Sequence, residues 1–131
     1  MIRPLTLVAL MLTAAPVALS ACAPAGAGVA QGYQGIQTVL LEGDVVIFRV
    51  AMTGARDETD VEAYARCAAA QYALIRGAGF ARHVRTNVAR DGNTWRGDGV
   101  YLISAALPRG FKTIDAEVTV RDCGEQAIPT V

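Results

Sequence analysis

The chain has 131 residues, of which 53% are hydrophobic, and its 12 basic and 12 acidic side chains give a formal net charge of zero. This length leaves room for one folded domain. Proteins that bind nucleic acid usually carry a strong excess of basic residues, so the charge balance argues against nucleic acid as the main partner. The chain has three cysteines, an odd number that leaves at least one thiol unpaired within the chain.

Residues 1–21 have the features of an export signal. Arg3 is the only charged side chain there, residues 5–19 form an apolar run, and small residues follow. The run is short for a membrane span, which needs ~20 residues, and it contains Pro16. We therefore expect a signal peptide, and an N-terminal transmembrane anchor that is never cleaved is the alternative.

The stretch Leu19-Ser20-Ala21-Cys22 resembles the lipobox of bacterial lipoproteins. The resemblance implies that the Cys22 sulfur is thioether-linked to diacylglycerol, that the chain is cut before Cys22, and that the new N-terminus also carries a fatty acid such as palmitate. Two or three acyl chains hold a protein stably on a membrane, whereas one chain binds only marginally. Membrane lipid is thus the first expected partner.

The residue after the lipobox, Ala23, bears on which membrane holds the protein. In the lipoprotein sorting rule an aspartate at this place favours the inner membrane, so its absence implies the outer membrane, with the domain facing the periplasm. The layout of the whole chain, with signal, lipobox, short tether and one domain, is similar to that of small uncharacterised envelope lipoproteins of alphaproteobacteria.

Residues 22–35 are rich in Ala, Gly and Pro and carry no charge. Such a segment cannot bury enough apolar surface to offset its loss of conformational entropy, so we expect a flexible tether that leads to a single domain over residues 36–131. An ordered first strand is the alternative.

The first half of the domain predicts a hairpin and a helix. Two apolar runs flank Glu42-Gly43-Asp44, which is typical of a tight turn between strands. A capping box from Thr59 to Glu62 predicts a helix start, and Gly77 predicts its end. One apolar stripe at helical spacing lies between them: Val61, Tyr64, Ala65, Ala68, Tyr72 and Ile75. We expect the two tyrosines to pack in the core; a ligand-stacking surface is the alternative.

The second half predicts three further strands, at residues 80–88, 100–107 and 114–121, with a turn at residues 91–93. Because Arg82 and Thr86 interrupt the apolar side of the first of these, it is expected near a sheet edge. The predicted fold is a two-layer α+β domain, with a mainly antiparallel sheet of about five strands in the order ββαβββ and one helix packed on one face.

Cys67 in the predicted helix and Cys123 after the last predicted strand are the thiols that remain once Cys22 is acylated. An exported protein meets an oxidising compartment, so we expect a Cys67–Cys123 disulfide that ties the helix to the C-terminal end of the sheet. Two reduced, unrelated cysteines are the alternative.

The residues that could carry catalysis are few. His83 is the single histidine, and a nucleophile built from Cys67 and His83 needs the free thiol that the disulfide removes. One histidine and two cysteines do not make a structural zinc site, and no cofactor motif is present. Ser104 lacks a nucleophile-elbow sequence, and Asp115 and Glu117 alternate with apolar residues as solvated strand positions.

A group of arginines follows the predicted helix: Arg76, Arg82, Arg85, Arg90 and Arg96. Period-2 alternation puts His83 and Arg85 on one strand face. Together with the neighbouring Arg82 they form a candidate site for anionic envelope material such as phospholipid headgroups. A strand edge that its charges protect from pairing is the alternative. The sequence thus predicts a non-enzymatic accessory or binding module of the cell envelope, with a possible protein partner. The alternative is a small periplasmic hydrolase or inhibitor domain that uses His83 and Arg85.

Overall fold

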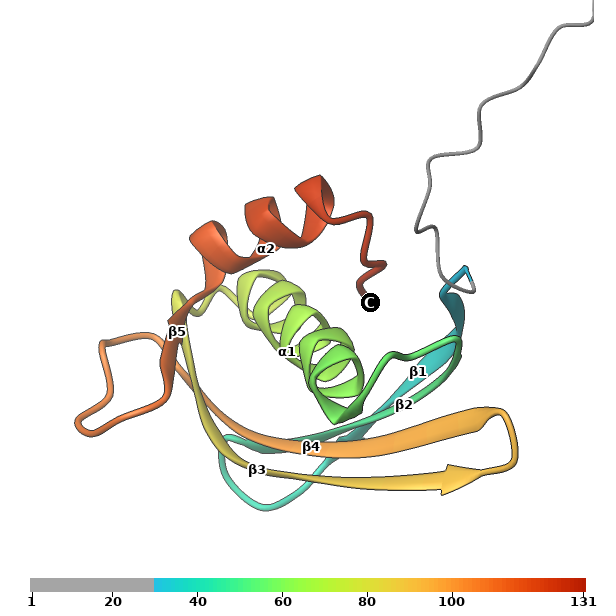
Figure 1. The fold of residues 1–131 in the computed structure, drawn as a ribbon. Helices are drawn as coiled ribbons and strands as arrows, with labels where there is room; N and C mark the ends of the chain where they lie inside the picture. Colours follow the sequence, from blue (N-terminus) through green and yellow to red (C-terminus); the bar gives the residue numbers. More distant parts are fainter. Residues whose placement is uncertain (1–29) are drawn as a thin grey trace, which may run out of the picture.

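The computed structural model describes residues 30–131, which fold into a curled five-stranded sheet with two helices on its concave side (Figure 1). The strand order is β1-β2-β4-β3-β5, and every neighbouring pair is antiparallel. The predicted α+β class and antiparallel sheet are therefore confirmed. The elements are β1 (Gly32–Leu40), β2 (Val45–Thr53), α1 (Glu58–Ile75), β3 (Phe80–Asp91), β4 (Thr94–Ser104), β5 (Thr113–Asp115) and α2 (Ala116–Glu125).

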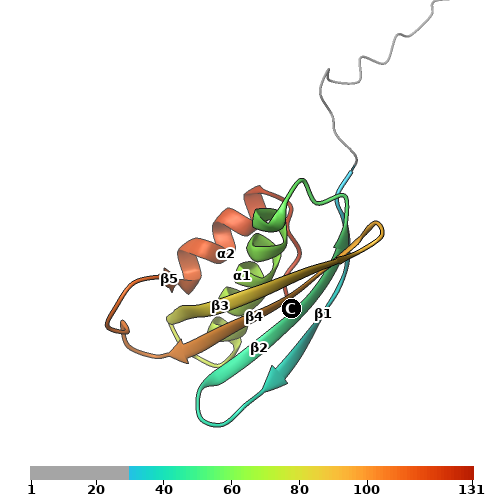
Figure 2. The ribbon, with the colours of Figure 1, turned by 60° about the horizontal axis from the view of Figure 1, so that its bottom comes forward.

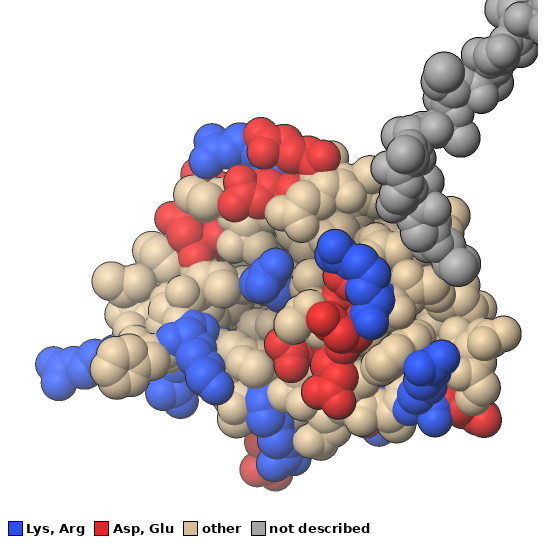
Figure 3. Space-filling view, viewed as in Figure 1, with Lys and Arg blue, Asp and Glu red and all other residues tan. Residues whose placement is uncertain are grey.

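The expected signal peptide and the lipobox cysteine Cys22 lie outside the described residues. Within residues 30–131, no helix has both the length and the apolar character that crossing a membrane requires. On the face shown in Figure 3, acidic and basic side chains are interspersed, as the balanced composition suggests.

Strand β1 begins at Gly32, so the prediction of a flexible tether is wrong for residues 32–35. Pairing with β2 orders this segment, with Tyr33 opposite Met52 and Ile36 opposite Val50. A β-bulge lies between Tyr33 and Gly35, and Gly35 has a φ of 133°, a conformation that glycine adopts without strain. The glycines thus allow an irregular strand here instead of preventing one.

The concave face of the sheet and one side of α1 form the core. On β2, Val46, Phe48, Val50 and Met52 are all buried, which confirms the predicted apolar face of that strand. The predicted stripe of α1 is buried at Val61, Tyr64, Ala65 and Ala68 and partly buried at Tyr72, but Ile75 is 63% exposed because the helix ends there.

Both tyrosines of the stripe pack against other aromatic rings. The Tyr64 ring lies 4.7 Å from that of Tyr33, and the Tyr72 ring lies 5.5 Å from that of Phe48, each pair in an edge-on arrangement. The Tyr64 hydroxyl also accepts a hydrogen bond from the backbone N–H of Gly35 at 3.2 Å. Core packing therefore describes Tyr64, whereas Tyr72 also reaches the wall of a surface cavity described below.

The start of α1 differs from the predicted capping box at Thr59. Asp57 is the N-cap, and its carboxylate accepts a hydrogen bond from the Thr59 backbone N–H at 2.9 Å and another from the Thr59 hydroxyl. An aspartate is as good an N-cap as a threonine, and its charge also complements the positive end of the helix dipole. Gly77, with a φ of 73°, follows the last turn as predicted.

A second helix replaces most of the predicted last strand, so the expected single helix is wrong. Strand β5 has only three residues, and Asp115 then caps α2 by accepting a hydrogen bond from the Val118 N–H at 3.1 Å. Ala116, Val120 and Cys123 are buried or partly buried at the i, i+4, i+7 spacing of a helix. Asp115 and Glu117 are therefore a helix cap and a first-turn residue instead of neighbours on a strand face.

The Cys67–Cys123 disulfide is present, with the two Cα atoms 6.0 Å apart. Because Cys123 lies in α2, the bond joins α1 to α2, and not α1 to the sheet as predicted. Cys67 is fully buried. The second helix covers the side of α1 that a single-helix fold would leave exposed.

The β3–β4 hairpin turns at Gly92 and Asn93, as the sequence predicts, and β4 starts at Thr94, six residues before its predicted start. The short strand β5 pairs only with residues 80–82 of β3. The rest of β3 forms a free edge, which confirms the expected edge position for most of this strand.

Candidate functional site

A β-bulge separates the residues of the predicted anion site. Along β3, His83 lies opposite Tyr101, but Arg85 lies opposite Val100, so Val84 is the extra residue of the bulge. An extra residue reverses the alternation of side chains between the two faces of the sheet. His83 therefore faces α1, and Arg85 faces the opposite, convex side, so the expectation that they share a face is wrong.

Arg82 lies opposite Leu102, in the same alternation as Val100, and so shares the convex face with Arg85. The predicted arginine group is spread further by the fold. The Arg90 guanidinium stacks on Trp95 at 4.9 Å, and Arg76 lies at the end of α1. These arginines therefore do not form one binding site.

His83 is half-buried on the helix side of the sheet. Its imidazole Nε2 lies 2.7 Å from the Thr86 hydroxyl, and its ring lies 5.1 Å from that of Tyr101. Burial lowers the pKa of His83 below its ordinary value, and the nearby positive charge of Lys112 contributes in the same direction. Across residues 30–131 no cluster of three or more His, Cys, Asp or Glu side chains forms a potential metal site.

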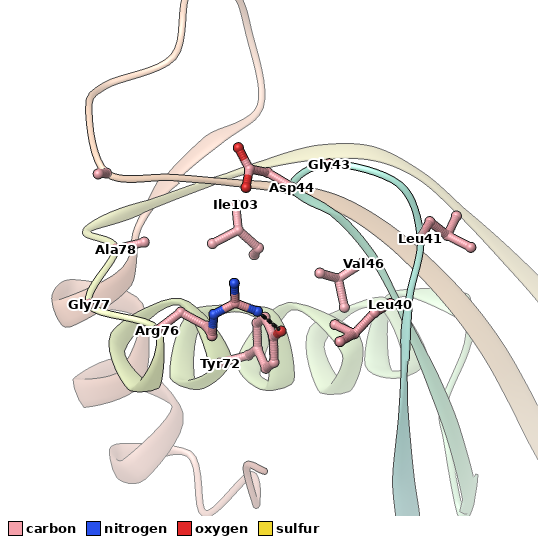
Figure 4. Close-up of a pocket in the computed structure, with 11 residues that line it drawn as sticks. Leu40, Leu41, Gly43, Asp44, Val46, Tyr72, Arg76, Gly77, Ala78 and Ile103 are labelled. Atoms are coloured by element: carbon pink, nitrogen blue, oxygen red, sulfur yellow. Dashed lines mark hydrogen bonds between the residues drawn. The ribbon is translucent and has the colours of Figure 1, made fainter.

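A surface cavity of about 350 Å³ lies at one end of the domain, between the β1–β2 turn and the end of α1 (Figure 4). This volume is at the lower limit of small-molecule sites. Its walls come from three strands, α1 and the segments that follow them: Leu40, Leu41, Gly43, Asp44, Val46, Tyr72, Arg76, Gly77, Ala78, Ile103 and Ala105.

Two charged side chains of opposite sign lie in the wall of this cavity. The Arg76 guanidinium donates a hydrogen bond to the Tyr72 hydroxyl at 2.6 Å (Figure 4), and Asp44 lies in the β1–β2 turn. In the part of the chain that the structure describes, the ion pairs are Arg49–Asp98 and Arg56–Asp60, so Arg76 and Asp44 both remain available to a partner. Sequence reasoning missed this cavity because its walls are far apart in the chain.

Exposed apolar side chains gather around the same end of the domain. They lie at the end of β1, at the end of α1 and in the loop that joins β4 to β5: Leu40, Leu41, Ile75, Leu107 and Phe111, which are 47–93% exposed. Figure 1 shows that this end is opposite the point where the chain enters the domain. We call these five residues the distal apolar group.

The entry point is fixed by a buried carboxylate. Asp60 in α1 is 8% exposed and accepts hydrogen bonds from the Gln31 side chain at 2.9 Å and from the Arg56 backbone N–H at 2.8 Å. The Arg56 guanidinium also binds it at 2.8 Å. Hydrogen bonding to Arg56 lowers the pKa of Asp60 to about 2. The chain therefore enters β1 at a defined place beside the start of α1.

The folded domain described above matches a known protein family. The sequence model of the YNQ4 C-terminal domain matches residues 33–127, which run from β1 through α2. The chain belongs to this family. A curated relative, an uncharacterised 26.9 kDa protein in the nqo8 5′ region of Paracoccus denitrificans, is 31% identical over 106 residues, which cover 76% of this chain.

This chain spans only 41% of the length of that relative. No solved structure matches the chain. The family match includes Cys67 and Cys123, all residues that line the cavity and the whole distal apolar group, and it excludes Cys22 and the segment before it. The family match thus covers the folded domain and not the segment that would attach it to a membrane.

Proposed function

We propose that this protein is a lipoprotein of the bacterial cell envelope that acts as a non-enzymatic accessory or binding module. The observation that carries the proposal is the pairing of the cysteines. Two of the three are joined as Cys67–Cys123, so Cys22, at the end of the lipobox-like stretch, is left with no thiol partner in the chain. A disulfide is also characteristic of exported proteins.

The shape of the domain supports binding at the end away from the membrane. A tether from Cys22 would reach the domain at Gln31, beside the start of α1. The distal apolar group and the 350 Å³ cavity would then be presented on the far side, towards the periplasm. Exposed apolar groups of this kind, with a polar surround, are typical of protein interaction sites.

The position of His83 favours binding over hydrolysis. A general base must reach a nucleophile and a substrate proton, and catalytic triads hold the imidazole with a carboxylate. The hydrogen-bond partner of the His83 imidazole is the Thr86 hydroxyl, and Arg85 lies on the other face of the sheet. This geometry supports the binding role more than a hydrolase that uses His83 and Arg85 together.

The lipid anchor is tested with the variant Cys22→Ser in cells fed labelled palmitate. We expect the wild-type chain to incorporate the label and to lose residues 1–21, as intact-mass measurement would show. The Cys22→Ser variant should remain unlabelled and uncleaved. As a matched control, the double variant Cys67→Ser/Cys123→Ser should still be labelled, because its lipobox is intact. An unlabelled wild-type chain, or a labelled Cys22→Ser variant, would overturn the anchor.

The binding role is tested separately with photo-crosslinking side chains in intact cells. We expect discrete crosslinked products from probes placed at Leu41 and Phe111, both exposed at the distal end. A probe at Asn93, in the exposed β3–β4 turn at the other end, should give none. Equal crosslinking from all three positions would contradict a binding surface at the distal end.

A further inference from the structure

The two edges of the sheet differ in charge. The free edge of β3, beyond its pairing with β5, carries Arg85, Arg90 and Asp91. Strand β1, along the opposite edge (Figure 2), has the sequence GYQGIQTVL and carries no charge and no proline. Natural sheets block edge-to-edge pairing with charges, prolines or bulges, because an edge strand presents unpaired backbone N–H and C=O groups. The β3 edge has charged residues along its length, and β1 has only its bulge.

The bulge of β1 affects only its first part. After Gly35, the strand runs regularly opposite β2 from Ile36 to Leu40. With Leu41, this gives the six-residue sequence IQTVLL, in which Leu40 is 60% and Leu41 47% exposed. Uncharged segments of this length with high β-propensity and no proline are those that pair readily with identical strands. An exposed edge segment of this type is therefore expected to pair with another strand.

We propose that β1 pairs antiparallel with β1 of a second copy of this chain, centred on Thr38, to give a two-fold symmetric dimer with a continuous ten-stranded sheet. An uncharged strand can face its own copy without repulsion between like charges. Two-fold symmetry closes the assembly, because each copy uses its one uncharged edge. The inference goes beyond the proposed function and does not depend on the lipid anchor.

The register centred on Thr38 matches side chains on both faces. On the concave side, Ile36 would lie opposite the partner's Leu40, and Thr38 would lie opposite the partner's Thr38. An aliphatic pair and a threonine pair are both favourable across antiparallel strands. On the convex side, Gln37 would lie opposite the partner's Val39. This register removes exposed aliphatic surface from Leu40 of each copy.

Other registers are less well matched. A shift by one residue would centre the pair on Gln37 or Val39 and would place Ile36 or Leu40 opposite a threonine in two-fold symmetric pairs. Pairing that extended into the first part of β1 would meet the bulge at Gly35, where the Gly35 N–H already donates to the Tyr64 hydroxyl. The regular segment from Ile36 to Leu40 therefore defines both the length and the centre of the interface.

The register is tested by cysteine crosslinking of the full chain in intact cells. Thr38 and Asn87 are both exposed strand residues, on β1 and on the free edge of β3. We expect Thr38→Cys to form a covalent dimer on mild oxidation, at least about tenfold more than Asn87→Cys, because a disulfide needs Cα atoms within ~7 Å. The wild-type chain under the same conditions should stay monomeric on a non-reducing gel, which controls for Cys22.

A second pair of variants separates edge pairing from general apolar association. Leu40→Lys adds a charge to the β1 edge, and Leu107→Lys adds one to an equally exposed residue in the β4–β5 loop. In the Thr38→Cys background, Leu40→Lys should abolish the covalent dimer, and Leu107→Lys should leave it unchanged. Native mass measurement of the wild-type chain in detergent should give two copies.

A wild-type chain of one copy in the native mass measurement, equal dimer yield from Thr38→Cys and Asn87→Cys, or an undiminished dimer in the Leu40→Lys variant would each overturn the proposal. Because these residues are exposed, the variants should keep the Cys67–Cys123 disulfide and the circular dichroism of the wild type, which distinguishes lost pairing from lost folding. The palmitate experiment is independent, so failure of the anchor and failure of the dimer would be told apart.

Discussion

Gly99 of β4 and Ala65 of α1 lie so close that a Cβ atom on Gly99 would stand 2.8 Å from the Ala65 Cβ. Two residues earlier on the same strand, a Cβ on Gly97 would stand 2.5 Å from a methyl group of Val61. Real Cβ atoms do not come this close to their neighbours. The glycines of β4 and the small residues of α1 together set the short distance between the helix and the sheet.

This contact predicts that Gly99→Ala is destabilising although the change adds only a methyl group. Relief of the clash requires α1 to move away from β4, and overpacking of a core typically costs about 1–3 kcal/mol. The matched control is Gly124→Ala in α2, where a new Cβ meets nothing within 4 Å and alanine is the better helix former. Urea unfolding of both variants checks the prediction, and equal stability of the two would contradict it.

The disulfide between α1 and α2 should contribute a large share of the stability. It joins residues 56 apart in sequence, and in the chain-entropy model a loop of this length corresponds to about 4 kcal/mol in the free energy of unfolding. We expect the double variant Cys67→Ser/Cys123→Ser to unfold at much lower urea concentration than the wild type. Reduction of the wild-type protein should give a similar shift, and unchanged unfolding after reduction would refute the prediction.

Asp60 predicts a loss of stability in acid. Hydrogen bonding to Arg56 lowers its folded-state pKa to about 2, below the ordinary value of 3.8. The unfolded chain therefore binds this proton first, so the contribution of Asp60 is fully present above about pH 4 and is lost as the pH falls towards 2. Asp60→Asn should flatten this part of the stability curve.

At neutral pH, Asp60→Asn should lower the free energy of unfolding by about 1–3 kcal/mol, the usual cost of losing a hydrogen bond to a charged group. The control Asp98→Asn removes an exposed ion pair with Arg49 and should change stability little. Thermal unfolding between pH 2 and pH 7 measures both effects. An Asp60→Asn curve parallel to that of the wild type below pH 4 would show that the carboxylate is not perturbed.

His83 predicts a second, separate pH dependence. Its pKa is lowered by burial, so the folded state resists protonation that the unfolded chain accepts below about pH 6.5. Stability should therefore be highest above that pH and should decline as the pH falls through the histidine range. His83→Gln should remove this slope, whereas Asp60→Asn should retain it. A wild-type stability that is constant from pH 7 to pH 5 would contradict the lowered pKa of His83.

Much of the first half of the fold could be read from the sequence because its signals are local. The turn at Gly43, the apolar face of β2 and the end of α1 at Gly77 each depend on a few adjacent residues. The cysteine pairing could also be predicted from the sequence, because only two thiols remained once Cys22 was assigned to the lipobox resemblance. The predicted anion site is not formed in the structure, because the extra residue of the bulge, Val84, turns Arg85 to the other face of the sheet.

The C-terminal segment shows the limit of periodicity. Ile114, Ala116, Val118 and Val120 alternate as in a strand, yet Ala116, Val120 and Cys123 also have helical spacing. Sequence alone does not choose between the two patterns, because a short apolar run fits either. In the folded domain the segment is a helix, which buries Ala116 and Cys123 and brings Cys123 to the disulfide with Cys67.

By itself, the sequence determined the α+β class, the first hairpin, α1 and the disulfide partners, since near neighbours in the chain set turns, caps and alternation. The tertiary structure alone decided the strand order, the second helix, the split between His83 and Arg85, and the cavity beside Arg76. These features depend on contacts between residues far apart in the chain, where packing outweighs local preference.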